Sequence, residues 1–223
     1  WSKKPWIPAN EAENVILHPE RLDAPLHWKK PRRVFVDSMS DLFHEAIPMY
    51  FLAQVWEIME KTPQHTYQIL TKRADVMRRR AGEKDGMAWA FGVLPNVWLG
   101  VTVENQRWAN ERIPILLDTP ASVRFVSAEP LLGPIDLARY VGADWFRRSE
   151  DTDSAGINYL DWVIVGGESG PKHRLFNPDW ARSIVAQCRN AGVACFVKQL
   201  GGVHPGNRLE ELPEDLRVRE YPR

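Results

Sequence analysis

Six apolar runs in this chain each end in polar or charged residues that are able to bind a ligand or move a proton. These polar clusters occupy residues 37–41, 71–73, 102–104, 127–129, 166–169 and 198–199. A charged side chain at the end of an apolar run faces water, a partner or a ligand, since burying it alone is costly. The repetition of this pattern predicts a binding or active site.

The carboxylates of the clusters offer two kinds of chemistry. Glu104, Glu129 and Glu168 could bind an amine or a ribose hydroxyl, or act as a general base. The alternative is that each pairs with Lys72, Arg73 or Lys198 in a structural network. Asp37 and Asp41 are possible metal ligands, although a lone pair of aspartates carries little weight. Asp41 could equally cap the turn that follows it.

The remaining cluster residues contribute amines, hydroxyls and close backbone approach. Lys72 or Lys198 could form a Schiff base if desolvated, with ion pairing as the alternative. Gly166 and Gly167 leave room for a small molecule against the backbone, or simply form a tight turn. The candidate catalytic residues are Lys72, Lys198 and Asp41. The candidate cofactor-binding residues are Ser38, Ser40, Glu104, Ser127, Glu129, Gly166, Gly167 and Glu168.

The elements that would position these clusters alternate between strand and helix. Apolar runs predict strands over 33–37, 65–70, 96–103, 123–127, 161–165 and 194–197. Helical periodicity predicts helices over 49–61, 74–81, 107–117 and 178–190, with 82–92 as a loop and Pro114 shortening or kinking the third. Alternating strands and helices predict an α/β fold with a parallel sheet, and the carboxyl ends of such strands share one rim. Without a glycine-rich first turn, a partial (β/α) barrel is favoured over a doubly wound sheet.

Composition indicates an ordinary globular protein arranged as a single domain over residues 1–223. Residues 1–28 are predicted to be an irregular lead-in, 139–159 a surface insertion and 201–223 a polar tail. Lys and Arg together number 29, as do Asp and Glu, so no global field favours nucleic acid. No apolar run approaches the roughly 20 residues that cross a bilayer, and no signal-like segment is present. The chain opens on Trp1, and we expect a segment to precede it.

Cysteine, histidine and tryptophan give weaker signals. Cys188 and Cys195 lack metal-ligand spacing, so buried reduced thiols are expected ahead of a disulfide. The histidines show no metal spacing either, and no metal site is predicted. Among the ten tryptophans, Trp56, Trp108 and Trp180 fall on apolar helix faces and are expected in the core. Trp89, Trp98 and Trp145 do not fall on a predicted apolar helix face.

Long strings in the chain carry a family resemblance. The six strings are VFVDSMSDLFHEAIP, PQHTYQILTKR, LPNVWLGVTVEN, RIPILLDTPASVRFVSAEPLLGPIDL, LDWVIVGGESG and CFVKQLGG. Over roughly residues 17–202, the chain resembles a phage- and prophage-encoded "Gp" family of uncharacterised proteins. That family in turn resembles radical S-adenosylmethionine enzymes. The resemblance implies a radical-SAM-like partial barrel, S-adenosylmethionine and a [4Fe–4S] cluster held by three cysteines. No three-cysteine motif exists in this sequence, so the cluster ligands are absent from the chain.

The expected function is S-adenosylmethionine binding at the carboxyl rim, with an unknown substrate. By this resemblance Glu129 and Glu168 would hold the ribose or amino group, and Ser38, Ser40 and Asp41 would lie nearest the cluster. The expected location is the cytoplasm of a bacterial host or phage-infected cell, without a membrane partner. One alternative is a cluster-free lyase or aldolase that uses Lys72 or Lys198. Another is a non-catalytic phage accessory module that binds protein or nucleic acid through the basic run 28–33 and exposed tryptophans.

Overall fold

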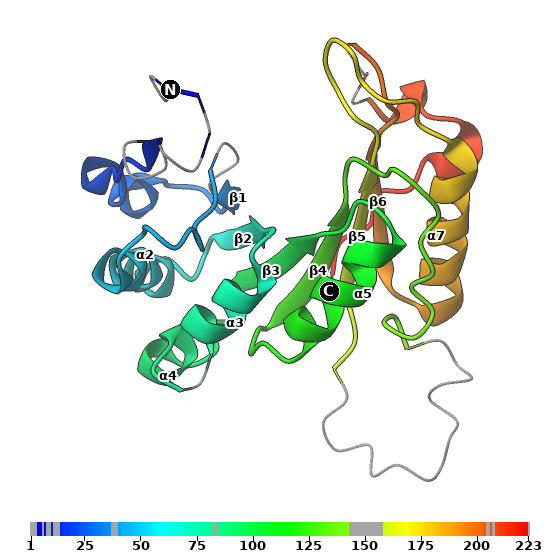
Figure 1. Ribbon diagram of the computed structural model, residues 1–223. Helices are drawn as coiled ribbons and strands as arrows, with labels where there is room; N and C mark the ends of the chain where they lie inside the picture. The colour runs from blue at the N-terminus through cyan, green and yellow to red at the C-terminus, as the bar shows by residue number, and fades with distance from the viewer. Residues whose placement is uncertain are drawn as a thin grey trace, which may run out of the picture. The chain divides into compact units, whose positions relative to one another are not determined.

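The computed structural model describes residues 4–5, 7, 10, 14–36, 40–82, 84–142, 158–203, 206 and 208–222. Strands and helices alternate along it (Figure 1). The strands are β1 (Arg33–Val36), β2 (Thr66–Thr71), β3 (Val97–Thr102), β4 (Val123–Ala128), β5 (Trp162–Gly166) and β6 (Ala194–Gln199). The α-helices are α2 (Met49–Lys61), α3 (Ala74–Ala81), α4 (Met87–Phe91), α5 (Gln106–Leu117) and α7 (Pro178–Ala191). Short 3-10 turns are η2 (Pro19–Arg21), η3 (Ala24–His27), η4 (Leu209–Glu211) and η5 (Glu214–Leu216).

The strands follow the chain order β1-β2-β3-β4-β5-β6 within the sheet. β1 pairs in parallel with β2, and β5 pairs in parallel with both β4 and β6. The predicted α/β fold with parallel strands is therefore confirmed. A doubly wound sheet reverses its strand order at a switch point, whereas barrel topology keeps the order of the chain. The observed order is the sequential order of barrel topology rather than the reversed order of a doubly wound sheet.

The chain divides into two compact units. The first unit comprises Trp1–Trp98 and Thr119–Ser122, and the second comprises Leu99–Asp118 and Val123–Arg223. In the first unit, α2 forms where apolar residues recur at helical spacing, and its inner face buries Leu52, Val55, Trp56 and Met59. β2 presents Ile69 and α3 presents Met77 to the same interior. This core fixes the segments that carry the polar residues after β1 and β2.

A buried histidine joins the lead-in to the first two strands. His65 is fully buried, and its Nδ1 accepts a hydrogen bond from the Arg32 backbone N–H at 3.2 Å. Its Nε2 lies 3.2 Å from the Pro25 carbonyl oxygen and donates to it. The Trp28 ring packs edge-on against the imidazole at 5.4 Å between centroids. His65 thus ties η3 and the start of β1 to the start of β2.

Replacing His65 should destabilise the protein. His65→Ala leaves the Arg32 N–H and the Pro25 carbonyl without these partners and opens a cavity, so we expect a loss of about 3 kcal/mol in unfolding free energy. Urea denaturation followed by circular dichroism measures it. His27→Ala is the matched control, because His27 is exposed and, among the described residues, its ring nitrogen contacts the Asp23 carboxylate at 3.5 Å. Equal effects from the two substitutions would contradict this role for His65.

In the second unit, β4 and β5 form the centre of the core and α7 packs against β5 and β6 (Figure 1). All five residues of β5 are buried, as expected for a strand covered on both faces. The predicted start of α7 is confirmed: Asn177 caps it by accepting a hydrogen bond from the Asp179 N–H, and Pro178 follows at the first helical position. Gly192 ends the helix in the left-handed region.

Three segments differ from the sequence prediction. The loop predicted over 82–92 contains the helix α4. α5 runs continuously through Pro114. A proline removes only one helical hydrogen bond, and the next turn still closes because the Asp118 N–H donates to the Pro114 carbonyl oxygen. The segment after β6, expected as a surface tail, buries Leu212 and Leu216, and Arg219 lies antiparallel to Phe196. It supplies hydrogen bonds that an edge strand otherwise leaves unmade.

The tryptophan side chains differ in how far they are buried. Trp56 is buried, and Trp108 and Trp180 are half-buried, whereas the Trp89 side chain is 72% exposed. Trp145 and most of the 139–159 insertion lie outside the described residues. Within the described part of the chain, no helix combines the length and apolar character needed to cross a membrane.

Candidate functional site

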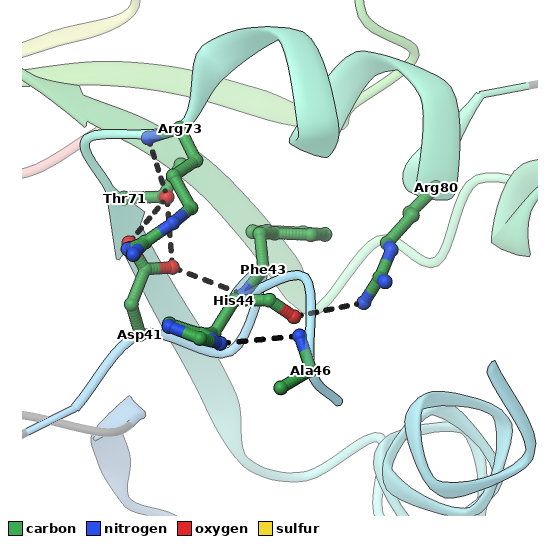
Figure 2. A network of polar contacts seen from close by, with 7 residues as sticks. All are labelled: Asp41, Phe43, His44, Ala46, Thr71, Arg73 and Arg80. Carbon is green, nitrogen blue, oxygen red and sulfur yellow. Dashed lines mark hydrogen bonds and ion pairs between the residues drawn. The ribbon is translucent and has the colours of Figure 1, made fainter. Parts of the chain in front are cut away.

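In the first unit, Asp41 is the centre of a polar network at the carboxyl end of β2 (Figure 2). Its carboxylate accepts hydrogen bonds from the Phe43 N–H at 3.0 Å and from the Thr71 hydroxyl at 2.8 and 2.9 Å. Arg73 Nη1 donates to the same carboxylate at 3.0 Å. The contact with Phe43 confirms that Asp41 caps its turn. The same four bonds occupy the oxygens that a metal or substrate would use.

The segment after Asp41 is held by a second set of contacts in the same network (Figure 2). The buried His44 accepts a hydrogen bond at Nδ1 from the Ala46 N–H at 3.2 Å. Arg80, from the end of α3, donates to the carbonyl oxygens of His44, Glu45 and Ile47 at 3.0, 2.8 and 2.7 Å. Burial, followed by the nearby charge of Arg79, lowers the Arg80 pKa. These contacts tie residues 44–47 to α3.

In the second unit, the ends of three adjacent strands meet around one ion pair. Glu129 follows β4 and Lys198 lies near the end of β6, and Lys198 Nζ is 2.9 and 3.0 Å from the two Glu129 carboxylate oxygens. β5 lies between these strands and ends at Gly166. A methyl group at Gly166 would lie 3.2 Å from the Glu129 Cδ. The glycine therefore provides the space in which the Glu129 side chain reaches Lys198.

The pairing of β5 with β6 shifts in register at Lys198. Val165 pairs with Val197 and Gly166 pairs with Gln199, so Lys198 has no opposing residue in β5. Register irregularities of this kind recur beside active sites. Lys198 is exposed while Val197 and Gln199 on either side are buried. The ammonium group is thus presented at the rim beside Glu129.

The backbone beneath the ion pair is tightly packed. A methyl group at Gly167 would lie 2.2 Å from the Gly201 backbone nitrogen. The Gly167 N–H donates to the Gln199 carbonyl at 3.1 Å, and Gln199 Nε2 donates back to the Gly167 carbonyl at 3.2 Å. Gln199 Nε2 also lies 3.4 Å from Glu129 Oε1. The carboxyl ends of β5 and β6 form a rigid base for Glu129 and Lys198.

Glu104, after β3, is also paired. Its Oε2 accepts a hydrogen bond at 3.1 Å from Arg112 Nη1, which also donates to the Thr102 carbonyl at 2.7 Å. The Arg112 guanidinium lies 4.0 Å from the centroid of the Trp108 ring. Glu104 and Arg112 are both buried, so this pair stabilises the junction of β3 and α5.

Glu168 closes the loop that follows β5. Its carboxylate accepts hydrogen bonds from the backbone N–H, Nε and Nη2 of Arg174 at 2.8, 2.8 and 2.9 Å. The side-chain hydrogen bond from Arg174, then its backbone N–H, lower the Glu168 pKa to about 2. The Arg174 pKa is raised, first by its hydrogen bond to Glu168, and the charge of Glu104 contributes as well. Glu168 is therefore ionised across the physiological pH range.

The Glu168–Arg174 contact should make stability depend on acid pH. The folded pKa of about 2 lies below the ordinary value of 4.5, so the contact stabilises the protein above pH 4.5 and is lost as the pH falls toward 2. Thermal unfolding midpoints of the wild type and Glu168→Gln should differ at pH 6 and converge toward pH 2. Arg174→Met should reproduce the loss, and a difference that persists unchanged at pH 2 would contradict the assignment.

The structure brings together only some of the predicted site residues. Glu129, Gly166, Gly167 and Lys198 lie in contact, with Glu129 paired to Lys198 as the structural alternative predicted. Ser127 is buried in β4. Lys72 and Ser40 are exposed, and Ser38 and Asp37 lie outside the described residues. The partners of Glu104 and Glu168 are Arg112 and Arg174, which sequence reasoning missed, although Arg112 lies two helical turns beyond Glu104.

The cysteines do not fit an iron–sulfur cluster. Cys188 in α7 and Cys195 in β6 are free and buried, which confirms the expected reduced thiols. A hydrogen bond with Cys195, followed by burial, raises the Cys188 pKa, whereas cluster ligands are thiolates. The chain contains no third cysteine. Over the residues that the structure describes, no group of three or more His, Cys, Asp or Glu side chains is arranged to hold a metal ion.

Comparison with known proteins identifies a family. The model of the family described as "Protein of unknown function (DUF5131)" matches residues 2–218, so the chain belongs to this family. No curated protein and no solved structure matches the chain.

Proposed function

For this member of an uncharacterised family, we propose that the rim formed by β4, β5 and β6 binds S-adenosylmethionine. The observation that carries the proposal is the Glu129–Lys198 pair across Gly166, at the end of the sheet where parallel α/β folds bind ligands. The family resemblance of the sequence to radical S-adenosylmethionine enzymes supplies the identity of the ligand.

The charges of the rim match the amino-acid end of this ligand. S-adenosylmethionine carries an α-ammonium and an α-carboxylate side by side. Glu129 and Lys198, 2.9 Å apart, offer one group of each sign, and neither is fully buried. A zwitterion can replace their mutual contact with two new ones, Glu129 to the ammonium and Lys198 to the carboxylate. Gly166 and Gly167 add no side chains that would obstruct the approach.

The fit does not extend to the cluster. The resemblance assigns an electron-donating [4Fe–4S] cluster to this class of enzyme, yet Cys188 and Cys195 do not supply its three ligands. The proposal for this chain is therefore ligand binding, with radical chemistry on an unknown substrate as its extension. A phage or prophage source of the protein and its location in the cytoplasm are proposals that likewise depend on the family resemblance. Iron and sulfide analysis after anaerobic reconstitution of the full-length protein tests the cluster separately.

Calorimetry with two ligands tests the binding site. The full-length protein should bind S-adenosylmethionine, and Glu129→Gln or Lys198→Met should weaken that binding about tenfold or more, as expected when a charged contact is lost. Methylthioadenosine lacks the amino-acid end, so these variants should bind it as tightly as the wild type does. Lys61→Met is the matched control, because Lys61 pairs with Glu57 on the exposed side of α2.

Two results would overturn the proposal. One is the absence of S-adenosylmethionine binding by the full-length protein. The other is binding that Glu129→Gln and Lys198→Met leave unchanged, because the ligand would then lie elsewhere. Circular dichroism spectra and unfolding midpoints of each variant distinguish a lost contact from a lost fold.

A further inference from the structure

The segment from β2 to α4 concentrates positive charge on the first unit. Residues 72–84 contain six basic and two acidic residues, in a chain whose net charge is zero. Three consecutive arginines, Arg78, Arg79 and Arg80, occupy the last turn of α3. Arg80 is directed at the carbonyls of residues 44–47, while Arg78, Arg79 and Lys84 are exposed.

Neighbouring charges act on Arg80. After burial, the charge of Arg79 is the next cause that lowers the Arg80 pKa, while the charge of Glu45 raises it. Three carbonyl contacts hold Arg80 in place, whereas the Arg79 side chain is exposed to solvent, where an anion could reach it.

A glycine turn leads from the basic end of α3 to an exposed tryptophan in α4. α4 contacts α3 and begins after Gly86, where a methyl group would lie 2.8 Å from the Arg80 carbonyl oxygen and 2.5 Å from that of Gly82. The start of α4 is thus packed against the end of α3. Trp89 follows three residues later with 72% of its surface exposed, and the buried Met87 anchors the helix beneath it. Figure 1 shows the two helices next to one another.

We propose that this α3–α4 surface binds single-stranded nucleic acid. Arg78, Arg79 and Lys84 are suited to contact phosphates, and the Trp89 indole is suited to stack on a base. Single-strand binding combines these two features, whereas a duplex keeps its bases stacked on one another. The basic run 28–33 is less suited, because its Trp28 ring packs against His65 and Arg32. This inference is independent of the proposed S-adenosylmethionine site.

Fluorescence anisotropy with labelled 15-nucleotide RNA, 15-nucleotide DNA and a 15-base-pair duplex tests the proposal in a salt series. We expect the single strands to bind more tightly than the duplex, with affinity that falls as salt rises. Trp89→Ala should weaken single-strand binding about tenfold, and Trp89→Phe should retain most of it. The double substitution Arg78→Ala/Arg79→Ala should reduce the slope of log affinity against log salt by about 1 to 1.5.

Matched controls lie on the second unit. Arg189→Ala removes an exposed arginine from the last turn of α7, and Leu175→Ala removes an apolar side chain that is 89% exposed. Neither should change binding. The proposal is overturned if no oligonucleotide binds at low salt, if the duplex binds as tightly as the single strands, or if folded Trp89→Ala and Arg78→Ala/Arg79→Ala bind like the wild type. If no oligonucleotide binds at low salt, we would instead assign this surface to an acidic protein partner.

Discussion

Gly167→Ala is expected to lower the unfolding free energy by about 3 kcal/mol and to abolish S-adenosylmethionine binding at the rim. The added methyl group would lie 2.2 Å from the Gly201 nitrogen and 2.5 Å from its Cα, both backbone atoms that no side-chain rotation moves aside. The ends of β5 and β6 must therefore separate. That separation breaks the hydrogen bonds between Gly167 and Gln199 and displaces Lys198 from Glu129.

Urea denaturation measures the first part of this expectation and calorimetry measures the second. Gly133→Ala is the matched control, because the nearest atom of the described residues to a methyl group there is the Asn105 Cβ, at 3.9 Å. We expect this control to remain within about 0.5 kcal/mol of the wild type, as substitutions without close contacts do. Wild-type stability in Gly167→Ala would show that the two strand ends are not packed as described.

The order of strands and helices could be predicted because it depends on local pattern. α2 and α3 lie at their predicted bounds, and the predicted strands lie within two residues of the observed ones. α4 was missed since glycines at 82, 86 and 92 surround a helix of five residues, whose stability comes from packing of Met87. The role of residues 208–222 was missed for a similar reason: their contacts with β6 involve distant parts of the chain.

Polar residues at strand ends indicate the candidate site, and the Glu129–Lys198 pair is one of the pairings expected from the sequence, whereas the partners of Glu104 and Glu168 are not. Polar residues at strand ends predict a rim because parallel strands share their direction. Lys198 lies 69 residues after Glu129, so the sequence leaves it as one of several possible partners, and the order β4-β5-β6 in the sheet selects it. Arg174 lies six residues after Glu168, yet their contact depends on how the intervening loop turns at Gly170, where φ is +106°.

Asp41→Ala is expected to lower the unfolding free energy by about 3 kcal/mol without changing S-adenosylmethionine affinity. The substitution removes the acceptor for the Phe43 N–H, the Thr71 hydroxyl and Arg73. Thr71 is buried, so its hydroxyl loses a partner where water does not readily replace it. Asp41→Asn retains one carbonyl acceptor and should cost less. Urea denaturation of both variants, with calorimetry alongside, measures these effects.

A double-mutant cycle identifies the source of the loss. Asp41→Ala and Thr71→Val should couple by about 1 kcal/mol, because each substitution removes the same hydrogen bond. Glu45→Ala is the matched control, since Arg80 contacts the carbonyl oxygen of this exposed residue, which the substitution leaves in place. Additive losses would show that Thr71 does not depend on Asp41. An Asp41→Ala protein of wild-type stability with impaired ligand binding would assign this carboxylate to the chemistry, since a structural carboxylate affects folding first.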